Sequence, residues 1–352
     1  MSIVIPIKIT FSNRFLLSRV RQQIQEFSTF REIEIIIVDS SPKMRYSNAL
    51  ASCCNFKSIS YHYLSMKSIY SVAKARNYGA KEARGDYLLF YDVDLIVKDN
   101  FIEKVLEDSK RFVMNSFTIY PCLYLSEAQT KIIEGKVLAN HVFEEIKERY
   151  LEGFNDEVLY LAVNTSTILV RREHFFNIGA YDEYYQGHGY EDFELIHRLY
   201  IAYPIVERKA DYILDYKTNF PGEYKGFRKY FSYYALPNFF EGKYTLHLWH
   251  SRPLLRKYYR TRKNNAKYFL KQLKESLSIK LPLNDVDLNL SNKMDLYIKQ
   301  QSMKSKFNNT IGLFELNKES LKSKKRGTFK QKFRKLVLEP KQFFLDAQFL
   351  KR

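Results

Sequence analysis

A short apolar run that carries two aspartates constrains the fold of this chain more than any other stretch. Residues 85–97 read Gly-Asp-Tyr-Leu-Leu-Phe-Tyr-Asp-Val-Asp-Leu-Ile-Val, and so short a run of bulky apolar residues predicts a strand buried on both faces. Because side chains alternate along a strand, Asp92 and Asp94 are expected to point to the same side of it. Two carboxylates are costly to bury unpaired, which favours a divalent cation or its polyphosphate partner beside them.

The stretches before this run alternate between strand and helix patterns. Strands are predicted at residues 2–8, 34–39 and 59–64, and helices at residues 13–27 and 72–83. This rhythm is typical of a parallel sheet wound with helices, whose ligands lie off the carboxyl ends of the strands. Since Asp39, Asp92 and Asp94 all occur at such strand ends, one cleft could hold all three.

The second part of the chain adds two further candidate groups. Predicted elements follow in the order helix 101–112, strand 117–123, charged helix 126–150, strand 158–170 and short helix 172–178. Glu191 and Asp192 then begin a helix that runs to about Ala202, where acidic residues more often only compensate the helix dipole. His247 and His250 could share a metal ion, although such pairs are more often surface or packed histidines.

Composition limits the classes of protein that this chain can belong to. Hydrophobic residues make up 45% of the chain, yet no stretch approaches the roughly 18 apolar residues of a membrane span. Residues 1–7 lack the basic lead and apolar core of a signal peptide, so a cytoplasmic protein is expected. The three cysteines fit neither a disulfide framework nor a zinc site.

The net charge of +18 requires an anionic partner such as nucleic acid, a membrane surface or a polyanionic substrate. Residues 318–352 hold twelve Lys and Arg against three Asp and Glu, which is half of that charge. Phe329, Phe333, Leu336 and Val337 fall on one helical face of this tail. Such a pattern fits an interfacial membrane helix or a helix docked on the protein's own core, and both interpretations stay open.

Five motifs, taken together and in order, resemble those of known enzymes. These motifs are the first strand, the strand that ends in Asp39, residues 73–79, Gly85-Asp86-Tyr87 and the Asp92-Val93-Asp94 run. They resemble the nucleotide-binding half of family-2-like glycosyltransferases of the GT-A fold. Residues 177–192 resemble the acceptor half of β-1,4-galactosyltransferases, polypeptide N-acetylgalactosaminyltransferases and bacterial chondroitin-type polymerases. Residues 247–252 look like the metal-binding segment that follows in those enzymes.

The resemblance implies a mixed, mostly parallel α/β sheet flanked by helices and assigns a role to each candidate residue. Asp39 would contact the uridine, Arg76 would lie near the nucleotide or diphosphate, and Asp92 would lie near the ribose. Asp94, His250 and His247 would ligate Mn²⁺ or Mg²⁺. The implied general base is Asp192, and Glu191 would contact an acceptor hydroxyl or the donor sugar. A base opposite the leaving diphosphate means in-line displacement with inversion.

The domain organisation follows from these motifs. We expect a glycosyltransferase domain at residues 1–252, divided into a nucleotide-binding half at 1–100 and an acceptor half at 101–252. A helical extension would cover residues 253–317 and a basic amphipathic tail residues 318–352. The tail is similar to tails of bacterial capsule glycosyltransferases, which implies an enzyme peripheral on the inner face of the cytoplasmic membrane.

The leading hypothesis is an inverting, metal-dependent hexosyltransferase that moves a sugar from a UDP-sugar to a glycan or lipid-linked glycan in a bacterial surface polysaccharide such as a capsule. Other capsule-synthesis proteins are possible partners, and no nucleic acid is expected. The alternative is a basic protein that binds nucleic acid or membrane without catalysis, motivated by the net charge and the 28 Tyr and 27 Phe. A metal-dependent nucleotidyl or phosphoryl transferase would explain the aspartate pair but not Glu191, Asp192 and His250.

Overall fold

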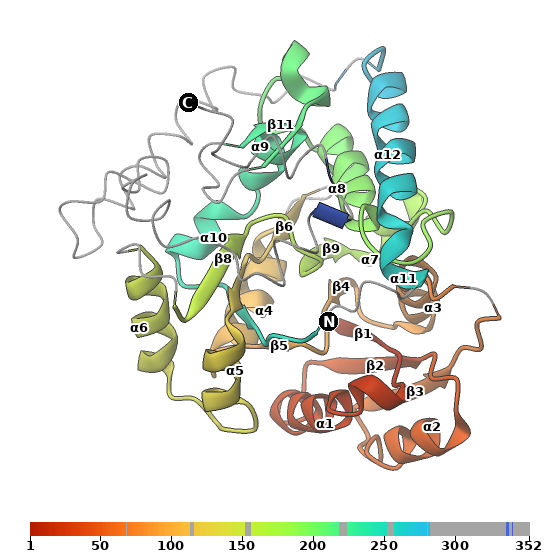
Figure 1. The fold of residues 1–352 in the computed structure, drawn as a ribbon, viewed down its shortest axis with the longest axis vertical. Helices are drawn as coiled ribbons and strands as arrows, with labels where there is room; N and C mark the ends of the chain where they lie inside the picture. The colour runs from red at the N-terminus through yellow and green to blue at the C-terminus, as the bar shows by residue number, and fades with distance from the viewer. Residues whose placement is uncertain are drawn as a thin grey trace.

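A six-stranded sheet forms the centre of the protein, in the order β3-β2-β1-β4-β9-β6 (Figure 1). The computed structural model describes residues 1–67, 69–112, 116–151, 156–217, 224–251, 257–279, 281, 336, 337 and 340. The strands are β1 (Ser2–Ile7), β2 (Glu34–Asp39), β3 (Ile59–Tyr63), β4 (Tyr87–Phe90), β6 (Phe117–Ile119) and β9 (Ile168–Arg171). The first four are parallel, whereas β9 runs antiparallel to both β4 and β6. The predicted mixed, mostly parallel sheet is therefore confirmed.

Apolar residues on both faces of the sheet explain why these strands read as continuous hydrophobic runs. Along β1, Val4 belongs to one buried cluster, while Ile3 and Ile5 belong to the other. Three helices connect the parallel strands: α1 (Leu16–Phe27), α2 (Met44–Ala51) and α3 (Val72–Glu82). Helix α3 packs directly on β1 and β2 because Gly79 has no side chain there, and a Cβ would lie 2.5 Å from a methyl group of Val4.

The predicted strand over residues 85–97 is wrong in one respect that matters for the site. Strand β4 ends at Phe90, and the short β5 (Leu95–Ile96) belongs to a different sheet. The backbone turns between them, and the Leu95 amide donates to the Asp92 carbonyl at 3.3 Å. Asp92 and Asp94 therefore lie in a loop, and their side chains need not share one side of a strand.

A second sheet, in the order β5-β12-β7-β8, lies beside the first. It contains β7 (Cys122–Leu125), β8 (Val158–Ala162) and β12 (Thr245–His247). The strand predicted at 117–123 is in fact two strands in different sheets, and so is the one predicted at 158–170. Both breaks occur where the chain crosses from one sheet to the other. The helix predicted at 126–150 is likewise two helices, α5 (Glu127–Ile133) and α6 (Asn140–Leu151), whereas α4 (Phe101–Arg111) agrees with the prediction.

The remaining elements lie mostly in the second part of the chain. They are α7 (Arg172–Asn177), α8 (Glu191–Ala202), β10 (Asp215–Tyr216), β11 (Lys225–Gly226), α9 (Phe227–Ser232), α10 (Leu236–Phe240), α11 (Lys257–Arg260) and α12 (Arg262–Ser276), with 3-10 helices at Phe11–Asn13 and Ala210–Ile213. Helix α12 packs beside α8, and its Phe269 is fully buried against aromatic rings there (Figure 1). Within the described ranges, no helix combines the length and apolar character needed to cross a membrane. Except for residues 336, 337 and 340, the tail predicted at 318–352 lies outside the described residues, as does most of 280–317.

Candidate active site

Asp39 ends β2 with a fully buried side chain whose two oxygens both accept hydrogen bonds. The Ser41 amide donates to Oδ1 at 2.8 Å, and the Ser41 hydroxyl donates to the same oxygen. The Tyr61 hydroxyl of β3 donates to Oδ2 at 2.8 Å. The turn that follows the strand and the neighbouring strand therefore fix the orientation of this carboxylate.

Arg76 joins the two halves of the chain. It lies on α3 with 1% of its surface exposed. Its Nη2 donates to Oδ1 of Asp92 at 2.8 Å, and its Nη1 donates to Oδ1 of Asp192 at 2.6 Å. Burial acts to lower the pKa of Arg76, but the two carboxylates raise it well above its usual value. A permanent positive charge thus connects the loop after β4 with the start of α8.

Glu191 and Asp192 occupy the first turn of α8, and an unusual backbone leads into that helix. Gly187, Gly189 and Tyr190 have φ of 73°, 86° and 79°, the left-handed region that favours glycine. Asp192 accepts from Arg76 and, at 3.2 Å, from the Tyr181 hydroxyl. The path of the chain thus directs Asp192 toward Arg76 instead of leaving it on a solvated helix face.

The two carboxyl groups of this turn have different surroundings. Burial raises the pKa of Glu191 to about 8, and the neighbouring Asp192 adds to the rise. The Oε2 atom of Glu191 is buried and has no hydrogen-bond partner in the described structure. Burial also raises the pKa of Asp192, although Arg76 opposes that rise. The arrangement therefore favours a protonated Glu191 at neutral pH, and it places the charge of Arg76 against Asp192.

A second cluster contains Asp94, which follows Asp92 by two residues in the chain, together with His247 and His250. One potential ligand atom from each of them lies within 4.8 Å of the others. His247 comes from the end of β12, where its ring stacks on Tyr124 at a centroid distance of 4.0 Å, and His250 follows in the next loop. A carboxylate oxygen with two imidazole nitrogens is a donor set that suits Mn²⁺, so these residues fit a divalent metal site.

Arg19 holds the segments that carry this cluster together. From α1 its Nη1 donates to Oδ1 of Asp94, its Nε donates to Glu134 at 2.7 Å and its Nη2 donates to the Trp249 carbonyl at 3.2 Å. The side chain is 4% exposed. Sequence reasoning missed Arg19 because it occupies the buried face of an amphipathic helix, where the pattern predicts only packing.

The structure brings the sequence-predicted residues together in two adjoining groups. Arg76, Asp92, Glu191 and Asp192 form the first, and Asp94, His247 and His250 form the second. The two groups meet at the loop that carries Asp92 and Asp94. Asp39 makes its hydrogen bonds to Ser41 and Tyr61 and belongs to neither group.

Ser166 was a second omission from the predicted site. Its hydroxyl donates to Oδ2 of Asp92 at 2.5 Å, from the connection between β8 and β9. No local pattern could have revealed a contact between residues 74 positions apart.

A sequence model for the family described as glycosyltransferase like family 2 matches residues 2–275. The chain belongs to this family. Its architecture is the GT-A fold that the motifs implied, with the matched region extending through α12. Among curated proteins, no sequence matches this chain.

The solved structures that are similar to this chain share little sequence identity with it. The S. aureus TarS 1–349 structure is 12% identical, covers 88% of this chain and 74% of its own, and has a TM-score of 0.40. The mannosyltransferase PcManGT from Pyrobaculum calidifontis, in complex with GDP-Man and Mn²⁺, is also 12% identical, with coverages of 86% and 71% and a TM-score of 0.42. A further S. aureus TarS structure is 15% identical with a TM-score of 0.32, matches 57% of this chain, and is matched over 33% of its own length. This chain therefore spans a third of that protein, and likeness at this level does not bear on substrates.

Proposed function

We propose that this protein is an inverting, metal-dependent glycosyltransferase that moves a sugar from a UDP-sugar to a glycan acceptor. The observation that carries the proposal is the pair of hydrogen bonds made by Arg76, which joins Asp92 of the nucleotide-binding half to Asp192 of the acceptor half. A transferase must hold the donor and the acceptor next to each other, and the Arg76 bridge holds the nucleotide-binding half against the acceptor half. Membership of the glycosyltransferase-like family supports the same reaction class.

Asp192 is the proposed general base. Its Oδ1 is engaged by Arg76 and Tyr181, so the carboxylate has a fixed direction from which it can accept the proton of an attacking hydroxyl. Glu191, with its raised pKa and an Oε2 without a partner, can donate a hydrogen bond to a sugar oxygen. Base and leaving group on opposite sides of the reacting carbon would invert its configuration.

The donor side of the site is assigned to the N-terminal half. Asp39, held by Ser41 and Tyr61, is the proposed uridine contact, and Asp92 is the proposed ribose-side contact. Asp94, His247 and His250 would hold the metal ion, which in enzymes of this type neutralises charge on a departing diphosphate. Arg19 and Glu134 orient the segments that carry these ligands.

Location and partners form a further part of the proposal. The basic composition of residues 318–352 supports an enzyme that is peripheral on the inner face of the cytoplasmic membrane and that builds a bacterial surface polysaccharide such as a capsule. A lipid-linked glycan acceptor fits this location, since its lipid would keep the acceptor at the same surface.

The decisive test is metal-dependent release of UDP from a panel of UDP-sugars by the purified protein and by Asp192→Asn. The substitution keeps the shape of the side chain but removes its basicity, so turnover should fall by roughly 10²- to 10⁴-fold while UDP binding is retained. Asp99→Asn, at an exposed position outside the site, is the matched control and should retain wild-type turnover. Equal UDP release by wild type and Asp192→Asn would show that the assigned base is wrong.

A further inference from the structure

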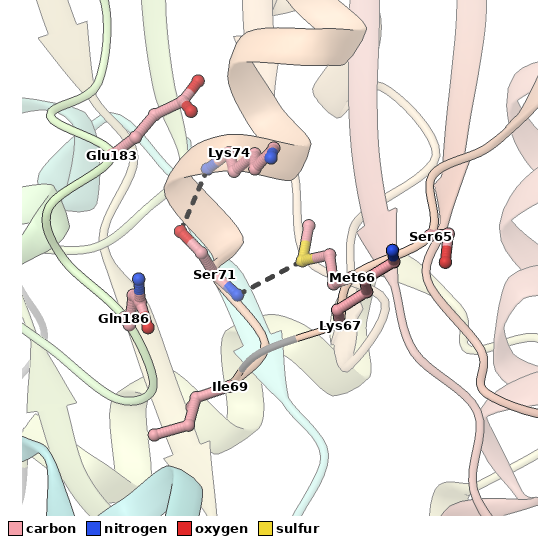
Figure 2. Close-up of a pocket in the computed structure, with 8 residues that line it drawn as sticks. All are labelled: Ser65, Met66, Lys67, Ile69, Ser71, Lys74, Glu183 and Gln186. Carbon is pink, nitrogen blue, oxygen red and sulfur yellow. Dashed lines mark hydrogen bonds between the residues drawn. The ribbon is translucent and has the colours of Figure 1, made fainter.

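A pocket of about 470 Å³ lies outside the residues discussed so far (Figure 2). It is lined by residues of the β3–α3 loop, the first turn of α3 and the loop before α8: Ser65, Met66, Lys67, Ile69, Ser71, Lys74, Glu183 and Gln186. Figure 2 shows the two loops on either side of the start of α3. Its volume is in the range of pockets that hold small organic ligands.

The chemistry of this pocket matches a carbohydrate. Lys67 and Lys74 offer ammonium donors, Glu183 offers an acceptor, and Gln186 and the Ser65 hydroxyl offer both. Ile69 and Met66 supply apolar surface that can cover the C–H face of a sugar ring. A purely apolar ligand would leave most of these polar groups unmatched.

Backbone contacts connect the pocket to the candidate active site. Gly187 donates from its amide to the Tyr70 carbonyl at 2.8 Å, and the Ser71 hydroxyl donates to the Tyr185 carbonyl at 2.9 Å. Residues 70–71 and 185–187 therefore run side by side as one wall. Ser71 and Gln186 face the pocket from this wall, and Glu191 follows four residues after Gly187.

A cluster of aromatic side chains occupies the other end of this wall, beside Glu191. We call Tyr70, His188, Tyr258 and Tyr259 the aromatic cluster, and all four are partly buried. The ring centroid of Tyr258 lies 6.1 Å from that of Tyr70, 5.8 Å from that of His188 and 5.1 Å from that of Tyr259. His188 belongs to the segment that leads into α8 and precedes Glu191 by three residues, which places this end of the wall next to the first turn of that helix.

Helix α12 holds the aromatic cluster and the pocket in fixed positions relative to each other. Asn265, which is buried, donates to the carbonyls of Gln186 and Gly189 at 3.1 and 2.9 Å. The His188 amide donates to the Tyr258 carbonyl at 2.9 Å. Both ends of the wall are thus held in place before any ligand arrives, which lowers the cost of binding an extended molecule.

We propose that the pocket and the aromatic cluster form an extended acceptor site, so that the acceptor is a glycan of at least two sugar units and not a single sugar. The sugar that receives the new unit lies on the aromatic cluster beside Glu191 and Asp192, and a preceding sugar of the chain lies in the pocket. This inference rests on the proposed transferase function and adds the class of acceptor to it.

Binding of paired ligands to the full chain tests this inference. The probes are the methyl glycosides of glucose, galactose and N-acetylglucosamine, and the matching disaccharides cellobiose, lactose and chitobiose, each titrated with UDP and Mn²⁺ present. At least one disaccharide should bind about fivefold or more tightly than its monosaccharide, which corresponds to one or two added hydrogen bonds. If no disaccharide has this advantage, the pocket is not an acceptor subsite and the inference is wrong.

Three variants separate the two parts of the site. The double variant Glu183→Gln, Gln186→Ala changes two exposed positions in the pocket and should abolish the disaccharide advantage while monosaccharide binding is unchanged. Tyr258→Leu removes a ring from the aromatic cluster and should weaken binding of both kinds of ligand. Glu275→Gln, exposed near the end of α12, is the control and should behave as wild type. A disaccharide advantage that survives the double variant would also overturn the proposal.

A separate measurement distinguishes failure of this inference from failure of the proposed function. All variants should bind UDP with Mn²⁺ within about twofold of wild type, because none of the altered residues lies among the proposed donor contacts. If the wild-type protein itself binds no UDP, the proposed function is wrong whatever the saccharides do. If it binds UDP but shows no preference for disaccharides, only the acceptor assignment fails.

Discussion

At the scale of single residues, the raised pKa of Glu191 makes a prediction about stability that does not depend on the identity of any substrate. Its folded-state pKa of about 8 lies above the usual glutamate value of 4.5, so folding favours the protonated form. The resulting contribution to stability is fully present below pH 4.5 and is lost as the pH rises through 8. Glu191→Gln should therefore stabilise the protein relative to wild type by up to about 5 kcal/mol at pH 9 and by about 2 kcal/mol at pH 6.

Thermal unfolding of the two proteins at pH 6 and pH 9 measures this difference. Glu183→Gln, at an exposed glutamate eight positions earlier, is the matched control and should show no such dependence on pH. A pH-independent difference between Glu191→Gln and wild type would mean that Glu191 is not protonated in the folded protein at neutral pH.

Arg19 leads to a second prediction at this scale, because its buried guanidinium already balances the charge of Asp94. Arg19→Met should destabilise the protein by roughly 2–4 kcal/mol, since it leaves Asp94 and Glu134 without their buried cation. Mn²⁺ should then raise the melting temperature of the variant more than that of wild type, as an added cation would replace the lost charge. Arg21→Met alters an exposed arginine of the same helix and should respond to Mn²⁺ as wild type does. Equal Mn²⁺ shifts in all three proteins would contradict this role for Arg19.

At the scale of elements, the loop that leads into α8 depends on the absence of a side chain at Gly187. Its φ of 73° is unfavourable for other residues, and a Cβ would lie 2.7 Å from the Tyr258 carbonyl and even closer to the Thr261 hydroxyl. Gly187→Ala should therefore cost roughly 2–3 kcal/mol and separate α11 from this loop. Gly135→Ala has a similar positive φ of 77° but meets nothing within 4 Å, so it isolates the backbone cost in a denaturant-unfolding comparison. Equal losses for the two variants would show that packing against Tyr258 and Thr261 is unimportant.

Local patterns in the sequence predicted elements well where one element stays in one sheet. The run Glu34–Asp39 and the helix Glu191–Ala202 have the expected bounds because their apolar periodicity and end signals are continuous. The patterns failed at residues 85–97, 117–123 and 158–170, where largely apolar runs cross between two sheets that are both buried. Burial on every side erases the periodicity that would mark a break, so only tertiary structure could reveal it.

The residues of the candidate site also fall into those that the sequence could indicate and those that it could not. Asp39, Asp92, Glu191 and the histidines were predictable because each stands at the end of an element, where polar residues are conspicuous against apolar runs. Their partners Arg19 and Ser166 were not, since nothing local distinguishes them from packing or loop residues. The contact of Arg76 with Asp192, 116 positions away in the chain, likewise exists only in the folded protein.

At the scale of the whole molecule, the uneven distribution of charge predicts that binding to membranes can be separated from binding to the donor. The proposed donor contacts all lie before residue 252, whereas residues 318–352 hold half of the net charge of +18. Removal of 318–352 should leave UDP affinity unchanged within about twofold. It should weaken recruitment to anionic phospholipid vesicles by more than tenfold at low salt, because each basic residue near such a surface contributes up to about 1 kcal/mol.

Vesicle sedimentation over a series of salt concentrations measures this prediction. Recruitment of the full chain should fall as salt rises, since the Debye length shortens from about 30 Å at 0.01 M to about 8 Å at 0.15 M. A variant with Lys330, Lys332, Arg334 and Lys335 changed to glutamine keeps the apolar residues of the tail, and its loss of recruitment would assign the effect to charge. Full-length protein that ignores anionic vesicles at low salt, or recruitment that salt does not weaken, would exclude an electrostatic membrane tail. Loss of UDP binding on truncation would instead mean that the tail completes the site, and the donor half could no longer be treated as independent of it.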